Sequence, residues 1–158
     1  MIRSAVPSDL PRIGALGALL VAEHHSFDPK RFLSPGKSTP AGYASFMGTQ
    51  LQNPDAIVMV AEEHGAVIGY VYGTVEGVDY MSLRGPAGAL QDIMIDPAHR
   101  RRGIGQRLLV AMLAALKARG VPRVVLSTAA ANDGAQQLFD KAGFRRTMIE
   151  MTREMDAG

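Results

Sequence analysis

The fold is decided by the stretch "AHRRRGIGQRLL", residues 98–109, in which three consecutive arginines stand directly before Gly103 and Gly105. The apolar residues that follow keep the 3.6-residue period of a helix. A cation at a helix N-terminus opposes the helix dipole by about 0.3–1 kcal/mol. Three arginines at this place therefore indicate a bound anion, which would take both the free backbone amides of the helix and the guanidinium groups.

The composition predicts a single domain over residues 1–158, because 47% of the residues are apolar and can supply one sizeable core. Charged residues make up 20% of the chain and the formal net charge is +2, which excludes a disordered chain and an overall nucleic-acid-binding balance. Removing the four arginines of the quoted stretch reverses the sign of the net charge. The basicity is therefore local.

The chain has no cysteine, which excludes disulfides, thiolate metal ligands and thiol nucleophiles. The N-terminus lacks a basic segment followed by an apolar core. The longest apolar patch, residues 15–22, is far shorter than the roughly 20 residues that span a bilayer. We therefore expect a cytoplasmic protein that binds neither membrane nor nucleic acid.

The first half of the chain reads as a strand, two helices and a hairpin. The turn residues Glu63, His64 and Gly65 separate two runs rich in β-formers, which should pair antiparallel. The segment 23–42 is rich in turn formers and is expected to be a mobile connection. The expected elements are a strand at 2–5, helices at 10–22 and 43–51, and strands at 56–64 and 66–78.

The second half alternates strands and helices after a glycine-rich connection at 84–89. Strand, helix and strand in succession form a crossover unit, whose two strands lie parallel inside an otherwise antiparallel sheet. The predicted fold is α/β (α+β), with a mixed, mostly antiparallel sheet of six to seven strands flanked by helices on both faces. The elements expected here are a strand at 90–97, a helix from 104 to Gly120, a strand covered on both faces at 123–129, a helix at 132–141 and an alternating last strand at 144–155.

Two other anion-binding motifs fail on individual residues. The dinucleotide-binding fingerprint requires a third glycine, and Leu108 occupies that place. The phosphate-binding loop of NTPases requires Lys followed by Ser or Thr, whereas Gln106 and Arg107 follow Gly105. Neither class of nucleotide site is therefore indicated.

The pattern Arg100-x-x-Gly103-x-Gly105, after a strand that ends at residues 93–97, resembles the pyrophosphate-binding motif of the GNAT superfamily of N-acetyltransferases. The segment "NDGAQQLFDKAGF", residues 132–144, is similar to the second cofactor segment of that family. The resemblance is good over residues 89–144 and looser over the first strand and helix. It implies the GNAT fold, in which a central parallel strand pair splays apart, and it implies acetyl-CoA as cosubstrate with no metal.

In this family the loop amides hold the pyrophosphate of acetyl-CoA, and the main chain of the splayed strand binds the pantetheine arm. One backbone amide within residues 93–95 would polarise the acetyl carbonyl. The cofactor-binding residues that the resemblance implies are Ile93, Met94, Ile95, Arg100, Arg101, Arg102, Gly103, Ile104, Gly105, Gln106, Asn132, Ala135 and Phe139.

The implied reaction is direct attack of an amine on the thioester, which needs a base for the ammonium proton and an acid for the CoA thiolate. The resemblance favours Asp92 as the base, with Glu76 on the adjacent strand as the reserve. Many relatives place a tyrosine acid in the last helix, but the matching position here is Phe139, so the acid stays unassigned. Three tyrosines are candidates, although they read better as sheet aromatics: Tyr70, Tyr72 and Tyr80.

The acceptor is expected to be the primary amine of a small molecule, bound near His24, His25 and Tyr80 at the edge of the first helix and the nearby loops. Two alternatives stay open: acetylation of a protein N-terminus or lysine, and a non-catalytic acyl-CoA-binding module, which Phe139 makes conceivable. The last strand, expected at 145–155, would leave an unpaired edge that invites pairing with another copy, so a homodimer is predicted.

Overall fold

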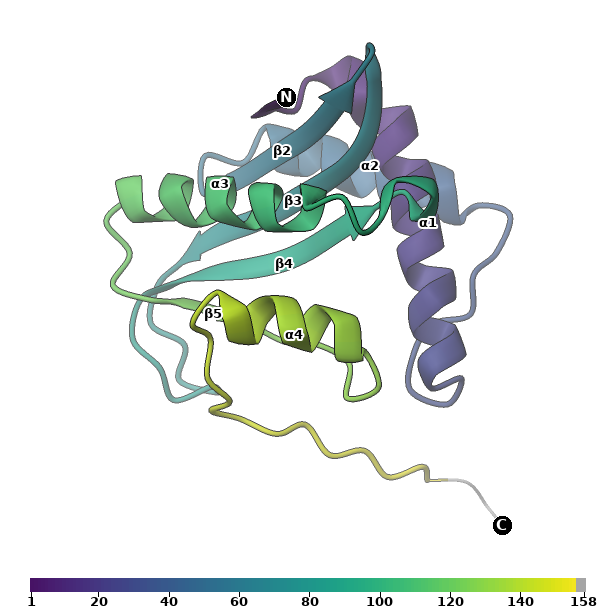
Figure 1. Ribbon diagram of the computed structural model, residues 1–158. Coiled ribbons are helices and arrows are strands. Elements are labelled where there is room, and N and C mark those ends of the chain that lie inside the picture. The colour runs from purple at the N-terminus through teal and green to yellow at the C-terminus, as the bar shows by residue number, and fades with distance from the viewer. Residues whose placement is uncertain (156–158) are drawn as a thin grey trace.

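The structure is a computed structural model that describes residues 1–155, so the last three residues of the expected domain lie outside the described part. After the first strand, two helices precede three successive strands, and a helix, a strand and a last helix complete the chain (Figure 1). The elements are β1 Ile2–Ser4, a 3₁₀ turn Pro7–Asp9, α1 Leu10–Phe27, α2 Thr39–Leu51, β2 Ala56–Glu63, β3 Ala66–Glu76, β4 Ala87–Ile95, a 3₁₀ turn Pro97–His99, α3 Ile104–Ala118, β5 Val124–Leu126 and α4 Asp133–Lys141.

One mixed sheet of five strands, in the order β1-β2-β3-β4-β5, forms the centre of the described chain. The first three neighbouring pairs are antiparallel, and β4 and β5 are parallel, as the crossover unit predicts. The expected hairpin between β2 and β3 is confirmed, with a turn at His64 and Gly65. The mixed α/β fold is therefore confirmed, whereas six to seven strands was too many.

The missing strand is the last one, because the segment 144–155 forms no strand. Met148, Ile149 and Met151 are 74%, 86% and 90% exposed, so the alternation of side chains does not correspond to a buried and an exposed face. A strand needs the backbone groups of a neighbouring strand, and within residues 1–155 this segment pairs with none. Figure 1 shows it running past α4 as an extended tail. The alternating pattern was not enough to predict a strand, because a strand also needs a neighbouring strand with free backbone groups.

The strands β4 and β5 pair only near the start of β4, where Gly88 to Leu90 face Val124 to Leu126. β4 continues to Ile95 with β3 on one side and, among residues 1–155, no strand on the other. This confirms the expected splayed parallel pair. The residues of β5 are partly rather than fully buried, and the strand is shorter than expected, because it ends where the two strands separate.

The first helix is longer than expected and ends at Phe27 rather than near Ala22. Glu23, His24 and His25 are compatible with a helix, and the first residues that break it are Asp28 and Pro29. The two histidines therefore belong to the end of α1 rather than to a loop.

In contrast, two other elements begin earlier than expected. β4 begins at Ala87, inside the glycine-rich segment, where Gly88 leaves room for Leu116 of α3: a Cβ at this glycine would lie 3.1 Å from the leucine side chain. α2 begins at Thr39, with Pro40 in its first turn, where the missing N–H costs no helical hydrogen bond.

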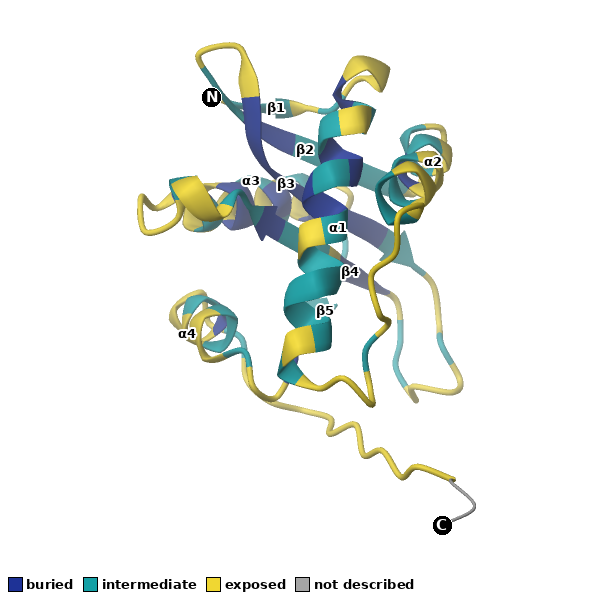
Figure 2. Cartoon of the chain, turned by 90° about the vertical axis from the view of Figure 1, so that its right-hand side faces the viewer, coloured by how far each residue is buried: buried dark blue, intermediate teal, exposed yellow. Residues whose placement is uncertain are grey.

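Helices cover both faces of the sheet, and the buried side chains form one cluster on each face. α3 covers one face with side chains that include Leu108 and Met112, and α1 and α2 cover the other with Leu16 and Met47. In Figure 2 the burial is concentrated along the central strands and the sheet-facing sides of the helices. No helix of the described residues is both long enough and apolar enough to cross a membrane.

Candidate active site

A cleft of about 810 Å³ lies along the unpaired half of β4. Residues 90–95 of β4 line it, together with α1 on one side and the beginning of α3, the end of β5 and α4 on the other. Figure 1 shows that α3 and α4 run in the same direction and that both begin near α1. The cleft therefore combines a free strand edge with two helix N-termini.

The free edge of β4 offers backbone donors to the cleft. The amide of Asp96 donates to the carbonyl of Ile68 at 2.8 Å, on the β3 side. Because N–H groups alternate in direction along a strand, the amide of Met94 also points toward β3 and those of Ile93 and Ile95 point toward the open edge. Of the three residues expected here, Ile93 and Ile95 thus supply the amides, and Met94 lines the cleft with its side chain.

The loop before α3 leaves the helix N-terminus uncapped. Gly103 is the N-cap, with a left-handed φ of 76° and no side-chain cap, and Arg101 also has a positive φ, 62°. A left-handed arginine is strained, and such strain gathers at functional sites. The first helical hydrogen bond runs from the amide of Arg107 to the carbonyl of Gly103. The amides of residues 104–106, which line the cleft, are therefore free to bind an anion.

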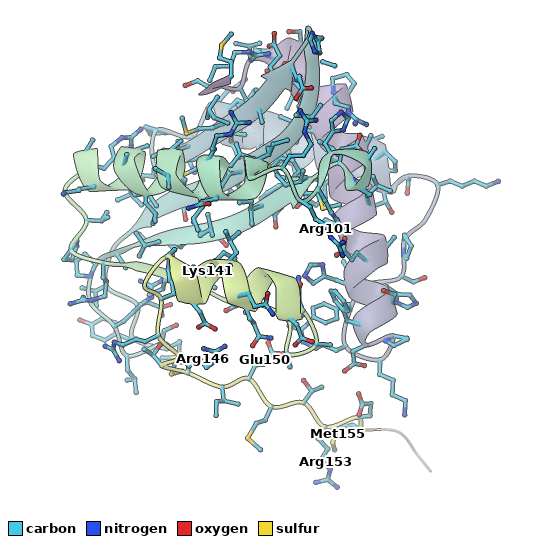
Figure 3. All side chains as sticks on the ribbon, in the orientation of Figure 1. Arg101, Lys141, Arg146, Glu150, Arg153 and Met155 are labelled. Carbon is cyan, nitrogen blue, oxygen red and sulfur yellow. The ribbon has the colours of Figure 1, made fainter. Side chains whose placement is uncertain are left out.

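The three arginines of the loop point to different places. Arg101 lines the cleft, and within residues 1–155 its guanidinium forms no ion pair; Figure 3 shows it between the start of α3, α1 and α4. Arg100 also lines the cleft and pairs with Glu23 of α1 at 2.7 Å. Arg102 lies outside the cleft, where it donates to both carboxylate oxygens of Glu63. The structure thus brings two of the three arginines to the site.

The second cofactor segment forms the opposite wall. The side chain of Asn132 caps α4 by accepting from the amide of Ala135 at 3.1 Å, and both residues line the cleft. Phe139 is only 6% exposed and packs edge-on against Phe144, with 5.9 Å between ring centroids. Phe139 therefore provides an apolar part of the cleft wall.

A β-bulge in β4 places Asp92 on the α1/α2 face of the sheet. Asp92 faces Tyr72 of β3, whereas the next partner, Gly73, faces Leu90, so Gln91 is an extra residue in β4. Such a bulge bends the strand and redirects side chains. The cleft therefore has a carboxylate on the face opposite to α3.

Asp92 has the surroundings of a base that works near neutral pH. Its Oδ2 accepts a hydrogen bond from the Tyr70 hydroxyl at 3.2 Å. Burial raises the pKa of Asp92 to about 7, because the charged form loses hydration. A carboxylate with a pKa near the working pH can take up a proton and release it again.

Of the other residues expected to act as acid or base or to bind the acceptor, only His24 lines the cleft. Glu76 lies outside the cleft, and its Oε1 accepts from Arg84 at 2.7 Å. Tyr80 is 79% exposed in the β3–β4 connection and is also outside. His24 lines the cleft, with its Nδ1 2.9 Å from the Leu20 carbonyl, whereas His25 does not line it.

None of the three candidate tyrosines lines the cleft. Tyr70 is fully buried and bound to Asp92. The Tyr72 hydroxyl donates to Gln50 of α2 at 2.9 Å. The tyrosines of β3 are therefore sheet aromatics with internal hydrogen bonds, as their strand positions favoured.

Sequence reasoning missed several lining residues, above all Glu23 and Lys141; Figure 3 labels Lys141. The helical period that continues past residue 22 could have placed Glu23 beside His24. Lys141 belongs to the second cofactor segment and adds a cation to the cleft lining at the end of α4. Residues 1–155 contain no group of three or more His, Asp or Glu side chains that could hold a metal ion.

A family model described as the acetyltransferase (GNAT) family matches residues 18–144. The chain belongs to the GNAT family. Both cofactor motifs and the splayed strands lie inside the matched region.

Among named GNAT relatives, the mycothiol acetyltransferase of Thermobispora bispora is 33% identical over 96 residues, which are 58% of this chain and 31% of that enzyme. This chain thus matches about a third of that relative's length. An uncharacterized N-acetyltransferase of Bacillus subtilis, YhfO, is 28% identical over 145 residues, covering 90% of this chain and 88% of that protein.

Solved structures show the same GNAT fold. A predicted acetyltransferase from Clostridium acetobutylicum, crystallised with acetyl-CoA, superposes with a TM-score of 0.75. The match covers 96% of this chain and 95% of that chain at 17% sequence identity. At this identity the likeness establishes the fold alone.

Proposed function

We propose that the protein transfers the acetyl group of acetyl-CoA to a primary amine of a small molecule. The observation that carries the proposal is the arrangement on β4. Asp92, a carboxyl with a pKa near 7, lies beside the outward-pointing amides of Ile93 and Ile95 on the same open strand. A proton acceptor and a carbonyl-binding donor are thus held next to each other.

The lining of the cleft supports acetyl-CoA as the acetyl donor. The uncapped amides of residues 104–106 and the guanidinium of Arg101 suit a pyrophosphate, which prefers backbone donors together with charged ones. The free edge of β4 suits the amide groups of a pantetheine arm, and the apolar side chains of Phe139 and Leu138 suit its hydrocarbon part.

In the proposed reaction the acceptor ammonium first gives a proton to the Asp92 carboxylate. The neutral amine nitrogen then forms a bond to the thioester carbonyl carbon. The amide of Ile93 or Ile95 stabilises the negative oxygen of the tetrahedral intermediate, a contribution of about 3–4 kcal/mol where one such donor has been removed in enzymes. When the carbon–sulfur bond breaks, the positively charged nitrogen of the intermediate gives its second proton to water, and the CoA thiolate leaves and takes a proton from water, since no tyrosine lines the cleft among the described residues.

Two features support a small, cationic acceptor. Asp92 and Glu23 both line the cleft on the α1 side and would attract an ammonium group. In addition, Arg31, just after α1, donates to both carboxylate oxygens of Glu150 in the tail after α4, at 2.6 and 2.8 Å. This bridge joins the segments that follow α1 and α4, whose helices line opposite sides of the cleft, and so it disfavours an open groove for a polypeptide.

The proposal is tested by incubating the protein with acetyl-CoA and a panel of primary amines while free thiol is measured. Release of thiol with at least one small amine, together with an acetylated product of the expected mass, supports it. Turnover only with peptides would instead assign protein acetylation. Calorimetric binding of acetyl-CoA without turnover of any amine or peptide would assign a non-catalytic acyl-CoA-binding module.

Two expectations remain part of the proposal. A homodimer is still predicted, although its original reason, an edge strand at 145–155, no longer applies; exposed Met148, Ile149 and Met151 now supply the apolar surface for it. Analytical ultracentrifugation would decide the oligomeric state. A cytoplasmic location also stays a prediction.

A further inference from the structure

A chain of three side chains leads away from the cleft on the α1/α2 face of the sheet. The Tyr70 hydroxyl lies 3.2 Å from Asp92 Oδ2 and 3.2 Å from the Tyr43 hydroxyl. Asp92 lines the cleft, Tyr70 is fully buried, and Tyr43 is partly exposed on α2 outside the cleft. These groups therefore connect the cleft to a residue that reaches the protein surface elsewhere.

Packing against α1 holds Tyr43 in this chain. A Cβ atom at Gly17 would lie 2.2 Å from Cδ1 of the Tyr43 ring, so the ring rests directly on the α1 backbone. The ring also meets Tyr70 edge-on, with 6.5 Å between the centroids. The position of the Tyr43 hydroxyl is thus fixed by two packed neighbours.

The order of the hydrogen bonds follows from the number of protons available. An ionised Asp92 can only accept, so the single Tyr70 proton points to it, and the Tyr70 oxygen then accepts from Tyr43. Once Asp92 has taken up a proton, it becomes a donor, and every bond of the chain can reverse. In the reversed order each donor points away from the cleft, so that one proton can then pass along the chain.

We propose that Tyr70 and Tyr43 carry the proton that Asp92 removes from the acceptor amine out of the cleft while both substrates are bound. The inference rests on the proposed function, in which acceptor and acetyl group cover Asp92 from the cleft side. The Asp92 proton passes to the Tyr70 oxygen, the Tyr70 proton passes to the Tyr43 oxygen, and the Tyr43 proton passes to water. Both tyrosines end neutral, and Asp92 becomes a carboxylate again.

The test uses variants that remove single hydroxyl groups and keep the rings. Tyr43→Phe leaves the bond between Tyr70 and Asp92 intact and should lower kcat roughly tenfold with an unchanged KM for acetyl-CoA. Tyr70→Phe should lower kcat at least as much. The double variant should be no slower than Tyr70→Phe alone, because both hydroxyls belong to one path.

Tyr72→Phe is the matched control. Tyr72 lies on the same strand and face, but its hydroxyl donates to Gln50 and not to Asp92, so this variant should keep the wild-type kcat. Equal kcat values for Tyr43→Phe and Tyr72→Phe would overturn the relay and leave Tyr70 as a positioning residue for Asp92.

A second measurement separates this inference from the proposed function. The pKa of Asp92, followed by NMR of its carboxyl carbon in the absence of substrates, should rise in Tyr70→Phe, because a donor to the ionised form is lost. It should change little in Tyr72→Phe. An unchanged pKa in Tyr70→Phe overturns the hydrogen-bonded chain whether or not any amine is acetylated, whereas absence of turnover in the wild-type protein counts against the proposed function alone.

Discussion

Arg100 and Glu23 form an ion pair of 2.7 Å that joins the loop before α3 to α1 across the cleft. Arg100 also donates to the carbonyl of Ile95 at 3.4 Å and so lies along the free edge of β4. The guanidinium thus occupies a position beside the groups that would hold acetyl-CoA. For Arg100 to bind a phosphate, it must release Glu23.

Glu23→Gln is therefore expected to strengthen the binding of acetyl-CoA. Both partners of the pair are partly exposed, and such pairs are worth about 0.2–1 kcal/mol, so the Kd should fall by a factor of about 1.4 to 5. Calorimetry at low salt measures this. Glu63→Gln is the control, because it frees Arg102, which lies outside the cleft. An equal fall in both variants would contradict the competition and indicate a general effect of net charge.

Gly105→Ala should weaken the binding of acetyl-CoA without destabilising the fold. A Cβ at this position would lie 3.7 Å from Leu138 and 3.8 Å from Ile95, which are ordinary contacts, so the unliganded fold has room for it. Alanine is also favoured over glycine inside a helix by about 0.5–1 kcal/mol. We expect an equal or higher Tm together with acetyl-CoA affinity that is roughly tenfold lower, because the methyl group stands where the main chain meets the phosphates. Unchanged affinity would place the pyrophosphate elsewhere.

The features that were predicted correctly from the sequence are those that depend on residues close together in the chain. The strand that stops before Pro97, the Arg/Gly loop and the periodic helix after it follow one another directly, and the structure contains each of them. The sequence of the loop does not reveal which of its three arginines face the cleft. That depends on Glu23 and Glu63, which are distant in sequence and hold Arg100 and Arg102.

Features that depend on contacts through space could not be predicted. The bulge at Gln91 arises from the pairing register with β3 and has no local sequence signal. Tyr43 was expected only as the start of a helix, and its link to Tyr70 depends on the close contact with Gly17. The tail at 144–155 was wrongly expected to be a strand, because alternation describes side chains and not the presence of a partner edge.

Two alanine substitutions at helix glycines should have opposite effects on the free energy of unfolding, because Gly17 contacts Tyr43 and Gly42 has open space around it. Gly17→Ala would press a methyl group into the Tyr43 ring and should destabilise the fold by about 1–3 kcal/mol. Gly42→Ala, in α2, has no atom within 4 Å of the new Cβ and should stabilise the fold by about 0.5–1 kcal/mol. Urea unfolding of both variants measures the difference. A stable Gly17→Ala protein would show that α1 and α2 are packed less closely than described.

Asp92→Asn should change the pH dependence of the rate and not only its size. Burial raises the pKa of Asp92 to about 7, so the fraction of carboxylate, and with it the wild-type rate, should rise as the pH increases through 7. The variant cannot accept a proton and should be slower by a factor of roughly 10² at neutral pH. The deficit should shrink at high pH, where the amine is already neutral. A small reduction that is uniform across pH would make Asp92 a structural residue.

The alkaline side of the profile should stay flat until the protein unfolds. Phe139 has no ionisable group where many relatives have a tyrosine. Burial raises the pKa of Tyr70 above its usual range, so its hydroxyl stays protonated, and Tyr72 is shifted in the same direction by burial and by the charge of Glu76. Loss of a tyrosine proton should therefore not slow the reaction within the measurable range.

Thiol release measured from pH 6 to about pH 10 checks this expectation, since an unshifted tyrosine ionises near 10. Phe139→Tyr supplies the comparison, because it returns a hydroxyl to the wall of the cleft that α4 forms. If the new hydroxyl reaches the departing sulfur, the variant should gain a falling alkaline limb that the wild-type protein lacks. A falling limb already present in the wild-type protein, and removed by Tyr70→Phe or Tyr72→Phe, would instead show that a tyrosine of β3 protonates the thiolate and that water does not.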